Sequence, residues 1–178
     1  MIRRTFLLLT TLLLFVLHCL AVPATASSVS LSWPDGQKAI TLTPETAAHY
    51  RKLAAQAFAN APEEVRAAQL SLEERAAFTL QLSDEERSFA ILWGLPAPEH
   101  ITQEHALLTA CAVLQAELQL SDEQLVQLFP VFTFEVTDPD APLWCISFLP
   151  TQGGVIRTVK LYAESGCAAE LTVTEAVG

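Results

Sequence analysis

The chain has 178 residues, of which 51% are hydrophobic, and its formal net charge is −10 at pH 7. Such a negative surface repels phosphate backbones and therefore argues against nucleic acid as a partner. The length suits one domain of ordinary size, which buries enough surface to fold without a disulfide or a metal.

The first 26 residues have the composition of a cleavable secretory signal. Arg3 and Arg4 make a basic start, residues 5–22 form an apolar stretch, and Ala24-Thr25-Ala26 places small residues at a cleavage site. We therefore expect residues 1–26 to be a signal peptide. The mature protein should be secreted or extracytoplasmic, in the cell envelope, and should not span a membrane.

Two alternatives remain open for this segment. The apolar stretch reaches the lower limit of about 18 residues for a spanning helix, so retention as a membrane anchor is one alternative. Lipid attachment at Cys19 is the other, and it is disfavoured because His18 is larger than the residue usual at that place.

Residues 27–98 are expected to form an N-terminal hairpin and helical region. Alternating residues 28–33, the turn residues Pro34-Asp35-Gly36 and a weaker alternation over 38–42 predict the hairpin. Thr43-Pro44 then predicts the start of a helix over 45–60, since proline is favoured at the first helical position.

Two shorter helices are expected next, over about 72–81 and 84–93. Each follows a serine with glutamate three residues later, Ser71 with Glu74 and Ser83 with Glu86, which is the pattern of a capping box. Gly94 and the prolines after it break the helical pattern, and we place the boundary with a C-terminal α+β domain, residues 99–178, at this break.

The C-terminal domain is expected to hold one main helix and four strands. Thr102 caps a helix over 103–118, and Ser121 begins a further short one. After Pro130 the apolar period changes from 3.6 to 2, which predicts antiparallel strands. The expected strands are 132–137, 143–149, 155–162 and 168–174. The fold class is therefore α+β, with the main helix packed on a four-stranded antiparallel sheet.

Three motifs in residues 100–174 resemble the PepSY-like domains of exported bacterial proteins. They are Ile101-Thr102-Gln103-Glu104-His105-Ala106, Pro142-Leu143-Trp144-Cys145-Ile146-Ser147-Phe148 and Tyr162-Ala163-Glu164-Ser165-Gly166, with Tyr162 where the family commonly has aspartate. The resemblance implies a helix packed on a small antiparallel sheet without catalytic residues. It also implies peptide binding or peptidase inhibition, which is proposed for some such domains.

Three cysteines follow the signal segment: Cys111, Cys145 and Cys167. An odd number cannot all pair within one chain, so either one bridge and one free thiol or three reduced thiols are expected. If a disulfide forms, we expect Cys145 with Cys167. Cys111 lies on an apolar helix face and is expected to be a small buried hydrophobe.

The remaining residues suggest no metal, cofactor or catalytic site. His100 and His105 are five residues apart, which does not place two ligands on one helix face, and His49 stands alone. The loop with Asp138 and Asp140 lacks the glycine and the distal glutamate of a calcium loop.

Three functions are compatible with these observations. The first is an exported non-enzymatic module whose sheet, residues 131–174, binds a peptide or modulates an exported peptidase. The second is a structural or accessory protein of the cell envelope or surface. The third is a hydrolase that pairs Cys145 or Cys167 with His100 or His105, and it requires a thiol beside an imidazole in the fold. We expect the first.

Overall fold

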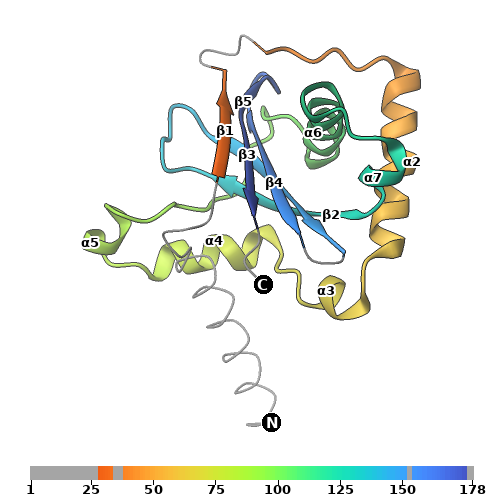
Figure 1. The fold of residues 1–178 in the computed structure, drawn as a ribbon. Coiled ribbons are helices and arrows are strands. Elements are labelled where there is room, and N and C mark those ends of the chain that lie inside the picture. The colour runs from red at the N-terminus through yellow and green to blue at the C-terminus, as the bar shows by residue number, and fades with distance from the viewer. Residues whose placement is uncertain (1–27, 34–37, 152–153, 176–178) are drawn as a thin grey trace.

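The computed structural model describes residues 28–33, 38–151 and 154–175. The expected signal peptide, residues 1–26, and the expected turn at Pro34-Asp35-Gly36 lie outside these residues. The described chain is α+β, as expected from the sequence, with one antiparallel sheet and several helices (Figure 1).

The sheet has five strands rather than the expected four, in the order β1-β5-β4-β3-β2. Four of them follow one another in the C-terminal half as a meander. The strands are β1 Ser28–Ser32, β2 Leu128–Glu135, β3 Leu143–Pro150, β4 Val155–Tyr162 and β5 Ala168–Glu175.

The additional strand, β1, replaces the N-terminal hairpin, and the hairpin prediction is therefore wrong. β1 pairs antiparallel with β5, which places Leu31 beside Leu171, and Lys38 makes only an isolated bridge with Ala168. The side chain of Leu171 is fully buried, so the edge of β5 gives β1 an apolar neighbour. The weakly alternating residues 38–42 offer little comparable surface.

Six helices complete the described fold: α2 Pro44–Asn60, α3 Glu63–Ala67, α4 Leu72–Gln81, α5 Asp84–Arg87, α6 Gln103–Leu118 and α7 Asp122–Leu125. Ser71, Ser83 and Ser121 each form a complete capping box, and Thr43 and Thr102 accept hydrogen bonds from the first turns of α2 and α6. These local bonds explain why the predicted starts are correct.

The helix expected over 84–93 is shorter than predicted, since α5 ends at Arg87. The residues after it return to the sheet instead, and Trp93 forms a bridge with Glu135 next to the end of β2. The Gly94 amide donates to the Phe134 carbonyl at 2.9 Å. A Cβ on Gly94 would lie only 2.7 Å from a methyl carbon of Val136, so this close approach requires glycine.

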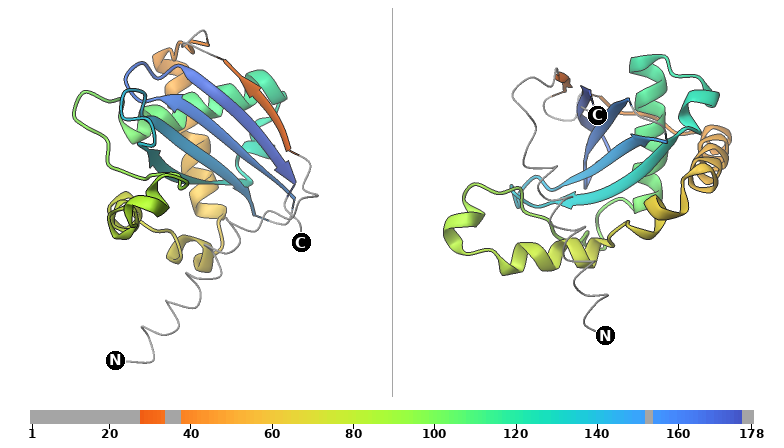
Figure 2. Two further views of the ribbon diagram at one scale, coloured as in Figure 1. Left: turned by 90° about the vertical axis from the view of Figure 1, so that its left-hand side faces the viewer. Right: turned by 60° about the horizontal axis from the view of Figure 1, so that its bottom comes forward.

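The core lies between α6 and one face of the sheet, with α2 packed beside α6 (Figures 1 and 2). Trp144, Ile146, Val159 and Leu161 line the sheet side and are almost completely buried. The Trp144 indole donates to the Ile101 carbonyl at 3.0 Å, which satisfies the one polar atom of this side chain.

Candidate binding surface

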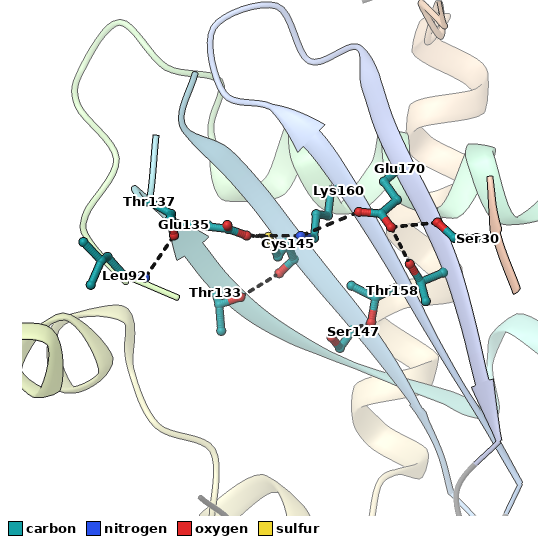
Figure 3. A network of polar contacts seen from close by, with 11 residues as sticks. Ser30, Leu92, Thr133, Glu135, Thr137, Cys145, Ser147, Thr158, Lys160 and Glu170 are labelled. Atoms are coloured by element: carbon teal, nitrogen blue, oxygen red, sulfur yellow. Dashed lines mark hydrogen bonds and ion pairs between the residues drawn. The ribbon is translucent and has the colours of Figure 1, made fainter. Parts of the chain in front are cut away.

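The face of the sheet turned away from α6 is polar. Side chains alternate between the two faces of a strand, so Cys145 and Lys160 point to the face opposite Trp144 and Leu161. Hydroxyl groups continue this face across neighbouring strands, and the Ser147 and Thr158 oxygens are hydrogen-bonded at 2.9 Å (Figure 3).

A polar network on this face connects all five strands (Figure 3). The Lys160 ammonium on β4 lies 3.3 Å from a Glu135 oxygen on β2 and 3.6 Å from a Glu170 oxygen on β5. The Cys145 thiol on β3 donates to Glu135 at 3.6 Å, and the Ser30 hydroxyl on β1 donates to Glu170 at 2.7 Å. The network therefore ties the edge strand β1 to the middle of the sheet.

The environment of Glu170 and Lys160 keeps these two groups ionised. Burial works against ionisation of Glu170, but hydrogen bonds from Ser30 and Thr172 and the charge of Lys160 outweigh it and lower the Glu170 pKa. Burial likewise opposes the charge of Lys160, yet the nearby Cys145 and Glu135 raise its pKa overall. Both groups are therefore charged at neutral pH.

The outer edge of β1 is exposed. All five residues of β1 are exposed, and the Trp33 amide that follows the strand donates to the Ala169 carbonyl on β5 at 2.8 Å. Amide directions alternate along an antiparallel strand, so the Ser28, Ser30 and Ser32 amides point away from β5. Within the described ranges, no other segment pairs with that side of β1.

The opposite edge of the sheet is protected. There the amide of Val136 donates to the Leu92 carbonyl at 2.8 Å, so residues 92–94 run beside the end of β2. Pro130, which lies inside β2, has no amide hydrogen to offer an approaching strand. The two edges therefore differ in their capacity to accept a further strand.

All three described cysteines are free thiols. β4 lies between the strand of Cys145 and the strand that follows Cys167, so the expected Cys145–Cys167 disulfide is not formed in the structure. Strands two places apart are about 9.5 Å apart, which is more than a disulfide spans. Burial raises the pKa of Cys111 and of Cys145 to about 12, so neither is a ready nucleophile.

The three described histidines make separate contacts. His49 lies 3.2 Å from Asp122, His100 accepts a hydrogen bond from the Ala97 amide at 3.0 Å, and His105 lies beside Gly166. In the part of the chain that the structure describes, no hydrogen bond joins a thiol to an imidazole. The pairing required by the hydrolase alternative is therefore not formed.

No cluster of three or more metal-ligating side chains occurs among the described residues. The Asp140 amide donates to the Asp138 carboxylate at 3.0 Å, which is a local turn contact within the loop. None of the described helices combines the length and the apolar character needed to cross a bilayer.

A strand over residues 28–33 was expected, but neither its pairing with β5 nor the network was predicted from the sequence. The exposed edge of β1 depends on a partner strand 140 residues away, as the Ser30–Glu170 contact shows. One signal for the network was present: Glu135, Lys160 and Glu170 occupy outward positions on three of the expected strands, and opposite charges on one face are expected to pair.

Comparisons with family models, with curated proteins and with solved structures give no match to this chain. The resemblance of residues 100–174 to PepSY-like domains therefore stays a prediction.

Proposed function

We propose that the protein is an exported, non-enzymatic module that binds an extended peptide segment along β1. The observation that carries this proposal is the outer edge of β1, where three serine amides point away from the sheet. Such an edge accepts a further strand through main-chain hydrogen bonds, which is a recurring mode of peptide recognition.

The side chains of β1 indicate the kind of peptide. Val29 and Leu31 are exposed on the side of the sheet that carries the core, and the three serines lie on the polar side. A bound strand would therefore place apolar side chains next to Val29 and Leu31. Glu170, which lies beside Ser30, favours neutral or basic residues on the other side.

The proposed location and partner rest on the sequence. The pattern of residues 1–26 supports export, and the PepSY-like motifs support a peptide or an exported peptidase as the partner. The absence of catalysis is part of the proposal and is supported by the raised pKa values of Cys111 and Cys145.

The test uses two variants of one residue. Ser30→Pro removes the outward amide, whereas Ser30→Ala keeps it, and both lose the hydroxyl that contacts Glu170. The purified protein would be titrated with a library of extended peptides and with a panel of exported peptidases. We expect binding by the wild type and by Ser30→Ala, and at least about a tenfold weaker affinity for Ser30→Pro.

Circular dichroism of Ser30→Pro would establish that the sheet is retained. Equal affinities of the two folded variants, or no binding to any peptide or peptidase, would overturn the proposal.

A second candidate function, a structural or accessory protein of the cell envelope or surface, is favoured by the symmetry of β1. The sequence Ser28-Val29-Ser30-Leu31-Ser32 can pair antiparallel with itself around Ser30, with Val29 opposite Leu31. Because residues 92–94 cover the end of β2, such pairing would give closed dimers rather than fibres. A concentration-dependent dimer in sedimentation, lost in Ser30→Pro, would favour this function over peptide binding.

A further inference from the structure

Four large apolar side chains are exposed within a short segment next to β2, at the edge of the sheet opposite β1. The exposed fractions are 75% for Leu80, 89% for Phe89, 58% for Ile91 and 50% for Leu95. We call these four residues the 80–95 surface. Only three other large apolar residues of the described chain are exposed, so exposed apolar side chains are concentrated in this segment.

The segment that carries the 80–95 surface is tied into a fixed shape. The Trp93 amide donates to the Thr79 hydroxyl at 2.8 Å, which closes the segment from the end of α4 to the sheet. The Arg87 guanidinium donates to the Leu82 carbonyl at 3.1 Å and to the Leu80 carbonyl at 3.4 Å. A partner would therefore meet a preorganised surface, at a low entropic cost of ordering.

The segment also projects from the rest of the molecule. Figures 1 and 2 show α5 at the outer end of a long excursion of the chain, away from α6 and from β1. The segment contacts the sheet at β2, through the Trp93–Glu135 bridge. β2 and β1 are the two outermost strands of the sheet, on opposite edges. A partner on the 80–95 surface would thus leave the edge of β1 accessible.

The charges around the 80–95 surface are mainly negative. Residues 72–99 carry six carboxylates and two guanidinium groups. Hydrogen bonds from the backbone and from a serine hydroxyl at the helix starts lower the pKa of Glu73 and of Glu86, so these groups stay ionised at neutral pH.

From this combination we infer that the 80–95 surface docks a segment of a partner protein that combines apolar side chains with lysine or arginine. Charge complementarity selects this occupant, because a second copy of the chain would bring like charges together. An anionic bilayer would be repelled for the same reason. The inference does not depend on peptide binding at β1.

The test uses two synthetic amphipathic peptides with the same leucine-rich face, one with lysines and one with glutamates on its other face. Phe89→Ser removes the most exposed apolar side chain, and Val65→Ser on α3 is the control away from the surface. We expect the lysine peptide to bind the wild type and Val65→Ser equally, and Phe89→Ser at least about tenfold more weakly.

The charge requirement has its own variants. Asp84→Asn combined with Glu85→Gln should weaken binding of the lysine peptide, and Glu63→Gln, on α3, should leave it unchanged. Weakening of binding by added salt would support the inference further.

Four results would overturn the inference. They are equal binding of the two peptides, unchanged binding by Phe89→Ser, a dimer of the wild type that Phe89→Ser abolishes, and Phe89-dependent binding to vesicles that contain phosphatidylglycerol.

Discussion

The two faces of the sheet are built from different chemistry. On the face toward α6, Trp144, Ile146 and Val159 are buried, and apolar burial there contributes stability without a strong directional requirement. On the other face, Lys160 lies between two glutamates and contacts both of them. Such contacts contribute less free energy but depend on register, because a slip of one residue would turn these charges toward the core.

The largest effect is expected on the apolar face. Trp144→Ala should lower the free energy of unfolding by about 3–5 kcal/mol, because it leaves a cavity and an unpaired Ile101 carbonyl. Urea denaturation measures this loss, and Trp144→Phe, which keeps an aromatic ring, should cost less. A loss below about 1 kcal/mol for the alanine variant would mean that this face does not dominate stability.

A smaller effect is expected at the centre of the polar face. Lys160→Met leaves Glu135 and Glu170 half-buried without their shared cation and should cost about 1–3 kcal/mol. Lys52→Met, at an exposed position on α2, is the control and should stay within about 0.5 kcal/mol of the wild type. Equal free energies of unfolding for the two variants would show that the Lys160 contacts do not stabilise the fold.

The pH dependence of Glu170 sharpens the comparison further. Because the folded-state pKa of Glu170 is lowered, its contribution is present above the unfolded pKa and disappears as pH falls through the folded value. Glu170→Gln should therefore cost about 1 kcal/mol at neutral pH, and the difference from wild type should vanish in acid. Urea denaturation across this pH range checks the sign, with Glu175→Gln at the exposed end of β5 as control.

The smallest effect is expected for the hydroxyl pair on the polar face. Ser147→Ala and Thr158→Val remove the two ends of one hydrogen bond, and their coupling in a double-mutant cycle should be about 0.2–1 kcal/mol. Additive single effects would show that this pair contributes nothing to pairing of β3 with β4.

Features encoded by local contacts were predictable from the sequence. α6 and β4 span the expected ranges, because Thr102 caps the start of α6 and a local apolar pattern marks each element. The switch from helical to strand periodicity near Pro130 is also confirmed, although β2, Leu128–Glu135, begins four residues before the expected strand 132–137 and ends two residues before the end of that strand.

Features that depend on distant contacts were not predictable in the same way. β1 carries a strand pattern, but nothing near it in the sequence specifies β5 as its partner. Residues 88–93 are compatible with a helix, but residues 88–90 form a turn and the chain then continues to the Trp93–Glu135 bridge. The outer edge of β1 exists only because β1 pairs with β5, and this explains why that edge was not predicted as a binding surface.

The pairing of the first described strand with the last one has a consequence for how the protein is made. Ser30 and Glu170 are 140 residues apart, so β1 pairs only through a contact between distant parts of the chain. Closing so large a loop is entropically costly and slows folding. In a newly made chain, β1 therefore stays unpaired until β5 has been synthesised.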